Sequence, residues 1–247
     1  WDKARMDEML RTDPRIRRPV SLAFRSQRRA DSHAIWQAMT TFVASNGIRA
    51  MVVKPTNRAR GEDVSFHSTQ HPQLGGALMA ILEILSDRRS GVIVEERIVP
   101  PLLMIAGQAH DWNLRVWVVV NAEGQPVVAD MLVRHDLAQR NGPVNISRGA
   151  KTATLEKISS LLGWPEPQVT QVKASIRDQV QRAYWAIMKA AQQETGMGEL
   201  PYDILGIDLM SAAGDLQPVI LEVGGIRSMT QSMAIVLQRE IRELKRQ

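Results

Sequence analysis

Residues 202–225 constrain the fold most strongly, because two apolar runs there flank a short segment of small and polar residues. The runs cover 204–210 and 219–223, and the segment between them contains Ala-Ala-Gly-Asp. Apolar runs of this length on either side of a turn segment predict a β-hairpin. Each run carries a single acid, Asp208 in the first and Glu222 in the second.

The two acids of this hairpin need something that neutralises them if they lie close together. Alternation of strand side chains places Asp208 on the face of Met210, and Glu222 on the face of Ile220. With a loop centred on Asp215, the two acids stand opposite one another with Cβ atoms about 4.5–5.5 Å apart, where like charges are destabilising. A hard divalent cation between them would remove the repulsion. The alternative is that one or both acids face water, and the hairpin alone leaves both interpretations open.

Composition limits the classes of protein to which the chain can belong. Its 247 residues suffice for one large domain or two small lobes, and 44% hydrophobic with 23% charged residues indicates a globular chain. The chain has no cysteine, which excludes disulfides and thiolate metal sites, and no apolar run of about 18 residues that could span a membrane. We therefore expect a cytoplasmic protein. Because the first residue is Trp1 rather than Met, we also expect a processed or trimmed chain.

The formal net charge of +5 and the isoelectric point near 9.9 indicate an anionic partner. Nucleic acid is a poor candidate, because aromatic residues make up only 4% of the chain and Lys and Arg are scattered along it without a basic stripe. The phosphates of a small nucleotide, or an acidic substrate, account for the excess of positive charge equally well.

The predicted elements alternate between helix and strand. Asp31 or Ser32 is expected to cap the second helix and Asn46-Gly47 to close it. Pro100 and Pro101 predict a bend between two lobes. The order of elements favours an α+β fold with largely antiparallel strand pairs. The expected helices cover 3–11, 32–45, 74–85, 168–193 and 226–244, and the expected strands cover 20–24, 49–54, 64–67, 91–94, 114–120 and 126–134.

Lys54 ends an apolar strand and precedes a polar loop that holds Arg58, Arg60 and Gly61. Cations beside flexible backbone N–H groups suit phosphate oxygens, because charge and hydrogen-bond donors point at the same anion. The alternative is an ordinary exposed strand end. The loop lacks the Gly-Lys-Ser/Thr ending of a Walker A sequence.

Arg115 lies inside an otherwise apolar strand, on the face of Trp117 and Val119. Such an arginine lies either on a solvated face or in a polar site, and its apolar neighbours favour the site. Arg134 ends the next strand, and its planar guanidinium suits a substrate carboxylate. The five histidines show no metal-ligand spacing, and no Gly-x-Ser-x-Gly nucleophile elbow is present.

Taken in order, these segments resemble an ATP-grasp domain over nearly the whole chain. Asp2-Lys3 is similar to the opening of that fold, whose lysine contacts nucleotide phosphate. The segment around Lys54, Arg60 and Gly61 resembles the second phosphate lysine and the lid loop that contains glycine. By the same resemblance, Asp208 and Glu222 of the hairpin bind magnesium.

The middle of the chain resembles the nucleotide-binding hinge of this superfamily. In the segment Val94-Glu95-Glu96-Arg97-Ile98, the resemblance implies that Glu95 meets the adenine amino group and that the backbone near Ile98 meets a ring nitrogen, with Glu96 between them in the hinge. The passage 102–116 is similar to the "PLL … D-x-R" passage of tubulin tyrosine ligase-like and glutamate ligase-like members. That match places Asn113 at the ribose and Arg115 at the terminal phosphate. The passage 144–150 resembles the "N-L-x-R-G-G" segment of the glutamate ligase-like branch and adds Asn145 to the nucleotide site.

The resemblance implies an α+β ATP-grasp fold in which two lobes, 1–96 and 97–247, clasp ATP with Mg²⁺. It implies an ATP-dependent carboxylate–amine ligase that forms an amide or peptide bond through an acyl phosphate, with Lys54, Arg115 and Arg134 as catalytic residues. The substrates would be an amine and a small molecule, peptide or protein tail that bears a carboxylate. Two alternatives remain open, a phosphotransferase on the same fold and a nucleotide-binding module without catalysis.

Two departures from the superfamily pattern matter for these alternatives. The metal motif usually ends Glu-x-Asn, whereas Glu222-Val223-Gly224 puts at the third position a glycine that has no side chain to coordinate a cation. This departure is the main argument for a module without catalysis. The sequence also opens at the Asp-Lys motif, so we expect the small α/β domain that commonly precedes the two lobes to be missing, and that domain often shapes the second substrate site.

Overall fold

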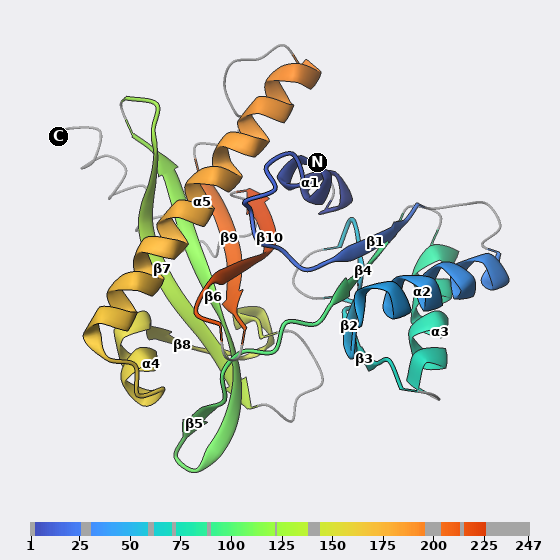
Figure 1. Ribbon diagram of the computed structural model, residues 1–247, viewed down its shortest axis with the longest axis horizontal. Helices are drawn as coiled ribbons and strands as arrows, with labels where there is room; N and C mark the ends of the chain where they lie inside the picture. Colours follow the sequence, from blue (N-terminus) through green and yellow to red (C-terminus); the bar gives the residue numbers. More distant parts are fainter. Residues whose placement is uncertain are drawn as a thin grey trace.

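A computed structural model describes residues 3–25, 31–58, 62–70, 73–87, 90–121, 123–137, 144–195, 204–212 and 215–225. These residues form two antiparallel sheets, one of four strands and one of six, each with helices packed on one face (Figure 1). The predicted α+β class with largely antiparallel strand pairs is therefore confirmed.

The first sheet has the strand order β1-β4-β2-β3 and is covered by two helices. Asp31 caps the first of these helices by accepting hydrogen bonds from the backbone N–H groups of His33 and Ala34, and Gly47 ends it in the left-handed conformation at φ 63°, which glycine adopts without strain. Apolar residues of both helices pack on the strands and form the first hydrophobic core. The elements are β1 (Ser21–Phe24), α2 (Ser32–Asn46), β2 (Ala50–Pro55), β3 (Ser65–Ser68), α3 (Gln73–Ser86) and β4 (Val92–Glu96).

The second sheet has the order β10-β9-β6-β7-β8, and β5 pairs with β6. The long helix α5 crosses one face of this sheet (Figure 1), and its apolar residues join those of the strands in a second core. None of the helices in the described part of the chain is long and apolar enough to cross a membrane. The elements are β5 (Leu103–Ile105), β6 (Gln108–Val120), β7 (Pro126–Leu137), η1 (Ile146–Arg148), β8 (Lys151–Thr154), α4 (Leu155–Leu161), α5 (Glu166–Thr195), β9 (Ile204–Ser211) and β10 (Pro218–Gly225).

Helix α1 (Lys3–Leu10) bridges the two sheets. Its buried Met9 and Leu10 belong to the second core, whereas the backbone N–H of Lys3 donates to the carbonyl of Thr56, just after β2, at 2.9 Å. The division of the chain into lobes 1–96 and 97–247 stays a prediction. The residues of α1 that pack in the second core precede all strands of the first sheet in the sequence.

Several predicted elements match the observed ones, and others lie outside the described residues. The helix expected over 226–244 is among the latter. The predicted elements did not include β5, β8 or α4, which have three, four and seven residues. Runs this short show only one or two repeats of a strand or helix period, so a search for periodicity can miss them.

Strand β10 contains a β-bulge that decides which side chains face the second core. Ile220 pairs with Leu209 and Glu222 pairs with Asp208, so Leu221 is left without a Cα partner on β9. Ile220 and Val223 are buried in the second core. Glu222 points to the opposite side, so the expectation that Glu222 shares a face with Ile220 is wrong. The extra residue of a bulge interrupts the strict alternation on which that expectation depended.

Candidate functional site

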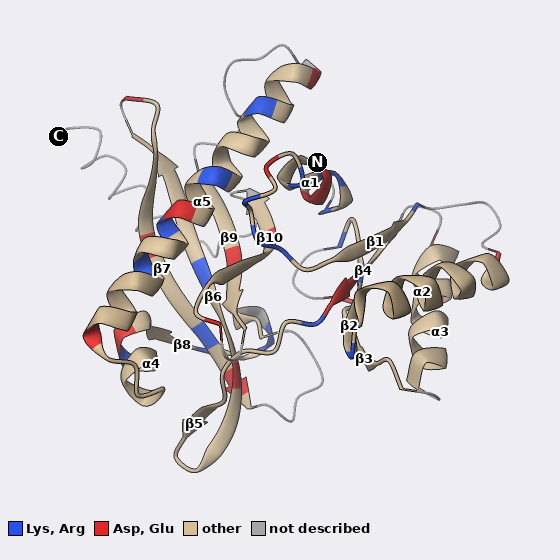
Figure 2. Cartoon of the chain, in the orientation of Figure 1, with Lys and Arg blue, Asp and Glu red and all other residues tan. Residues whose placement is uncertain are grey.

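A cavity of about 150 Å³ lies between the two sheets. Its walls come from β2, β3 and β4 on one side and from β6, β7, β9 and β10 on the other, with Lys3 of α1 at one end. Figure 2 shows charged segments on β4, β6 and β9, which stand out among strands that are mostly uncharged. Charged residues from distant parts of the chain therefore meet in one cavity.

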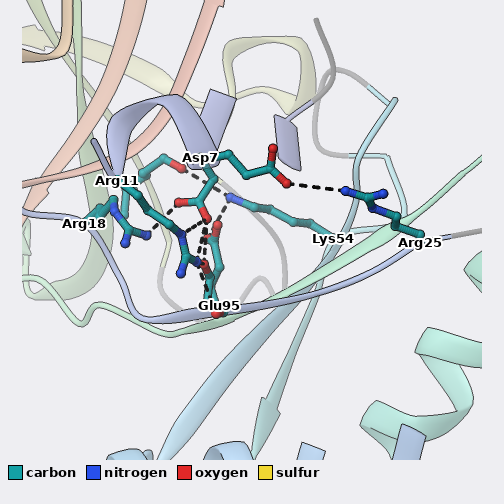
Figure 3. Close-up of polar contacts among 9 residues, drawn as sticks. Asp7, Arg11, Arg18, Arg25, Lys54 and Glu95 are labelled. Carbon is teal, nitrogen blue, oxygen red and sulfur yellow. Dashed lines mark hydrogen bonds and ion pairs between the residues drawn. The ribbon is translucent and has the colours of Figure 1, made fainter. Parts of the chain in front are cut away.

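Lys54 and Glu95 form a buried ion pair on the wall that belongs to the first sheet (Figure 3). The distance from Nζ of Lys54 to Oε2 of Glu95 is 2.7 Å, and each residue is 7% exposed. Burial raises the pKa of Glu95, and the Lys54 ammonium opposes that shift only in part. Burial also lowers the pKa of Lys54, but the carboxylates of Glu95 and Glu222 outweigh it and hold this pKa above its ordinary value. The Lys54 ammonium is therefore a charged group at neutral pH.

Lys54 also reaches the second sheet. Its Nζ donates a hydrogen bond of 3.2 Å to the backbone carbonyl of Leu221, the bulged residue of β10. Lys3 approaches the same strand, with its Nζ 3.6 Å from Oε2 of Glu222. The two lysines predicted to bind phosphate thus line one cavity, and each contacts a residue of β10.

Asp208 lies between two arginines on the wall that belongs to the second sheet. Nε of Arg115 donates to Oδ1 of Asp208, NH2 of Arg115 donates to Oδ2 at 2.7 Å, and NH2 of Arg134 lies 2.7 Å from Oδ1. Burial raises the pKa of Asp208, but the guanidinium groups of Arg115 and Arg134 outweigh it and hold the pKa below its usual range. Arg134 and Asp208 line the cavity, whereas Arg115 is absent from its lining and acts on it through Asp208.

Asn113 connects Arg134 to the loop that follows β7. Its Oδ1 accepts from Nε of Arg134 at 2.8 Å, and its Nδ2 donates to the carbonyl of Val144 at 3.1 Å. Asn145, the next residue, lines the cavity. Asn113 and Arg134 are cross-strand partners on β6 and β7, which explains why residues far apart in the sequence share these contacts.

The packing beside Arg115 depends on a glycine. Trp117 lies on the same face of β6, and the Arg115 guanidinium carbon is 5.2 Å from the centroid of its ring. Gly206 pairs with Trp117 across the sheet, and a Cβ atom at position 206 would lie 2.7 Å from both the Arg115 NH1 and the Trp117 ring. Only glycine leaves room for this arrangement.

The other hinge residues predicted from the sequence also lie along the cavity. Glu96 and Ile98 line it, together with Asp111 of β6, which the sequence analysis missed. NH2 of Arg97 lies 3.8 Å from Oδ2 of Asp111, and burial raises the pKa of Asp111 against the opposing charge of Arg97. Strand alternation could have identified Asp111, because it lies two residues before Asn113 on the same face.

Arg60 and Gly61, predicted as part of the lid loop, lie outside the described residues. Every other predicted site residue lines the cavity except Arg115, which touches its Asp208 wall. The structure therefore brings together residues from positions 3 to 222.

The acids of the cavity fit a magnesium ion that is bound together with phosphate. Within the described ranges no group of three His, Asp or Glu side chains is placed to hold a metal by itself. Mg²⁺ is commonly held by one or two carboxylates, with phosphate oxygens and water completing its coordination. Asp208 and Glu222, at paired positions, would supply those carboxylates, and Gly224 adds no side-chain ligand.

Comparisons with known proteins identify the fold. No family model matches the sequence, and no curated protein matches it. Among solved structures, D-cycloserine synthetase DcsG superposes with a TM-score of 0.59 at 16% sequence identity, covering 99% of this chain and 70% of that one. The C-terminal domain of K. lactis Pby1, an ATP-grasp enzyme that interacts with an mRNA decapping enzyme, has a TM-score of 0.56 at 14% identity, covering 97% and 68%.

D-alanine–D-alanine ligase from Bacillus anthracis also has a TM-score of 0.56 at 14% identity, and the match covers 99% of this chain and 66% of the ligase. The chain thus spans about two thirds of the length of these structures. The likeness shows that the chain has the ATP-grasp fold, as the sequence predicted.

Proposed function

We propose, from this ATP-grasp fold and from the charged cavity between its sheets, that the protein is an ATP-dependent carboxylate–amine ligase. The observation that carries the proposal is that Lys3, Lys54, Arg134, Asp208 and Glu222 all line one cavity. Three cations and two carboxylates, from both sheets and from α1, suit a polyphosphate and its metal ion better than they suit a neutral ligand.

In the proposed reaction, a substrate carboxylate oxygen attacks the γ-phosphorus of ATP, and ADP leaves. The amine nitrogen then attacks the carbonyl carbon of the resulting acyl phosphate, phosphate leaves, and the nitrogen loses a proton. Amide, ADP and inorganic phosphate are the products. Because such transfers depend mainly on positioning and on the stabilisation of charge, cations and carboxylates are the residues that the site needs.

The two lysines would bind phosphate oxygens near β10, because both line the cavity and each contacts a residue of that strand. Glu95 would hold Lys54 in place while its neighbours Glu96 and Ile98 line the part of the cavity that would take the adenine ring. Asn113 and Asn145 also line the cavity and would contact the sugar and phosphate groups of the nucleotide.

Arg134 would bind the substrate carboxylate or the phosphoryl group as it moves, and Arg115 would support it by sharing Asp208. Asp208 and Glu222 would hold Mg²⁺, which when bound neutralises the phosphate oxygens. Because both arginines already contact Asp208, this carboxylate must be shared between them and a metal ion.

The substrates follow from the proposed chemistry only as a class, namely a carboxylate on a small molecule, a peptide or a protein tail, and an amine. Two of the similar structures are a synthetase of D-cycloserine and a ligase of D-alanine, which favours testing amino acids first. Acidic peptides come second, because the chain carries a net charge of +5.

The test is release of ADP from Mg²⁺-ATP, screened over amino acids and acidic peptides as carboxylate and amine, with mass spectrometry of the product. We expect ADP release that requires both substrates, and a product whose mass equals their sum less one water. Glu222→Gln should reduce ADP release at least tenfold, because this substitution removes one carboxylate from the cavity. A stable phosphoester product would instead indicate a phosphotransferase.

A second candidate is a nucleotide-binding module without catalysis. It is favoured by Gly224, which offers no third ligand, and by Asp208, whose two carboxylate oxygens are both bonded to arginine. This function predicts that ATP binds while no pair of substrates yields ADP.

A further inference from the structure

The bulge in β10 provides Lys54 with a backbone hydrogen-bond acceptor that the proposed chemistry by itself does not require. It leaves Leu221 without a partner on β9, and the carbonyl of that residue accepts a hydrogen bond from Lys54, on the other sheet and 167 residues earlier in the sequence. Glu95, which lies on the same sheet as Lys54, binds the same ammonium at 2.7 Å. The Lys54 ammonium is thus held between one acceptor from each sheet.

We propose that Leu221 is a positioning residue for Lys54, and that its backbone carbonyl fixes the ammonium for an anionic group bound in the cavity. The inference rests on the proposed function, because it takes that anion to be a phosphate of ATP. It concerns a backbone atom, so no side-chain motif in the sequence could have pointed to it.

The geometry of an ammonium group supports this assignment. A lysine ammonium has three N–H donors and no acceptor, at the end of a flexible four-carbon stem. Glu95 and the Leu221 carbonyl take two of these donors, which leaves the direction of the third determined. A donor whose direction is set before the ligand arrives binds with a smaller loss of conformational freedom. Lys54 would therefore bind phosphate more tightly than a lysine paired with Glu95 alone.

The bulge also allows the Leu221 carbonyl to be removed without a change in the pairing of the two acids. Because Ile220 pairs with Leu209 and Glu222 with Asp208, deleting Leu221 would join the two pairs into a regular ladder. In that ladder Ile220 still faces the core, and Glu222 still faces Asp208 on the cavity side. The deletion therefore removes the carbonyl that Lys54 uses and preserves the pair of acids.

The test is the dissociation constant of Mg²⁺-ATP, measured by calorimetric titration in four proteins: the wild type, the Leu221 deletion, Lys54→Ala, and the two changes together. We expect the deletion to weaken binding about tenfold, the effect of losing one hydrogen bond to a charged group. In the Lys54→Ala background we expect the deletion to have no further effect, because the donor is gone.

Lys3→Ala provides the matched control, since Lys3 lines the same cavity and is paired with Glu222 rather than with Leu221. In that background the deletion should still weaken binding about tenfold. Equal losses in the Lys54→Ala and Lys3→Ala backgrounds would overturn the proposal, because the deletion would then act on the cavity in general. Unchanged affinity in the deletion protein would overturn it as well.

Thermal unfolding of each variant shows whether it folds. If the deletion protein does not melt cooperatively, Leu221→Gly replaces it, because glycine keeps the chain length and loosens the backbone that holds the carbonyl. Leu221→Gly should weaken the binding of Mg²⁺-ATP by about threefold and should have no further effect in the Lys54→Ala background. A loss of affinity that persists in the Lys54→Ala background would contradict the proposal. If wild-type protein does not bind ATP, the proposed function and this inference both fail. If it binds ATP and Lys54→Ala weakens binding while the deletion does not, only this inference fails.

Discussion

Asp208 and Glu222 face one another across the β9–β10 hairpin because β10 carries one residue more than a regular ladder needs. The hairpin starts in a register that would place Leu221, and not Glu222, opposite Asp208. The bulge shifts the register by one residue, so that Glu222 pairs with Asp208 and lines the cavity. The two acids then differ in environment, because Asp208 is bound by two arginines and Glu222 only approaches Lys3.

This difference predicts that replacing the two acids lowers stability by very different amounts. Asp208→Ala leaves Arg115 and Arg134 buried without their anion, and we expect the free energy of unfolding to fall by about 3–5 kcal/mol. Glu222→Ala removes a side chain that is 39% exposed and should change stability by less than about 1 kcal/mol. Urea denaturation followed by tryptophan fluorescence measures both, and equal losses would contradict the buried arrangement of Asp208.

Two glycines give a second contrast. Gly206→Ala places a methyl group 2.7 Å from the Arg115 guanidinium and the Trp117 ring, so we expect a loss of about 1–3 kcal/mol. Gly75→Ala, within α3, meets no atom within 4 Å and should stabilise the protein by about 0.5–1 kcal/mol, because alanine favours the helix. The two midpoints of chemical denaturation should move in opposite directions. A shift in the same direction would show that the space above Gly206 is not filled as described.

The attachment of α1 can be tested at Asp7. Its carboxylate accepts hydrogen bonds of 2.8 Å from Arg11, Arg18 and the hydroxyl of Ser21, and Figure 3 shows it among the two guanidinium groups. We expect Asp7→Ala to cost about 1–3 kcal/mol, because it leaves these donors without their acceptor.

Glu8 is the control for that substitution. It is the next residue on the same helix, its side chain is 47% exposed, and it pairs with the exposed Arg5. Glu8→Ala should change the free energy of unfolding by less than about 0.5 kcal/mol. If both alanine variants unfold at the same urea concentration, Asp7 does not anchor the helix.

A buried histidine pair predicts a dependence of stability on pH. Nδ1 of His135, on β7, lies 3.2 Å from Nδ1 of His110, on β6, and both residues are buried. Burial lowers the pKa of His135, with further lowering by His110, Lys151 and Lys157, while Asp136 opposes the shift. A group whose pKa is lowered in the folded state takes up its proton first in the unfolded state. Stability present above the ordinary value of 6.5 is therefore lost as the pH falls toward the folded-state pKa.

The measurement is the free energy of unfolding from pH 8 to pH 5, in the wild type and in His135→Gln. We expect the wild-type curve to fall below about pH 6.5 and the variant curve to fall less over the same interval. Parallel curves would show that another group is responsible.

Much of the local structure could be predicted from the sequence. Asp31 or Ser32 was expected to cap the second helix and Asn46-Gly47 to close it. The structure has Asp31 as the N-cap and Gly47 as the left-handed C-cap, because capping depends on a few residues near each helix end. The hairpin of β9 and β10 was expected from its two apolar runs, and the pairing of Asp208 with Glu222 is confirmed. The resemblance predicted the ATP-grasp fold, which the similar solved structures show.

The composition of the site could be predicted better than its contacts. Lys54 and Glu95 were expected at separate parts of a nucleotide, and the structure pairs them with one another. Arg134 was expected to be available for a substrate carboxylate, and in the structure it binds Asp208 and Asn113. Contacts between strands far apart in the sequence depend on how the two sheets lie against each other, which no local pattern encodes.

The sequence by itself determined that two acids lie on paired strands, that one lysine and two arginines end or interrupt apolar strands elsewhere, and that the strands are antiparallel. These features follow from the alternation of side chains and from turn residues, which act over a few positions. Only the tertiary structure decided that Leu221 is the bulged residue. Ile220, Leu221 and Val223 are all apolar, so the pattern does not show which of them the core takes. Packing buries Ile220 and Val223, leaves Leu221 and Glu222 on the cavity side, and places the Leu221 carbonyl within reach of Lys54.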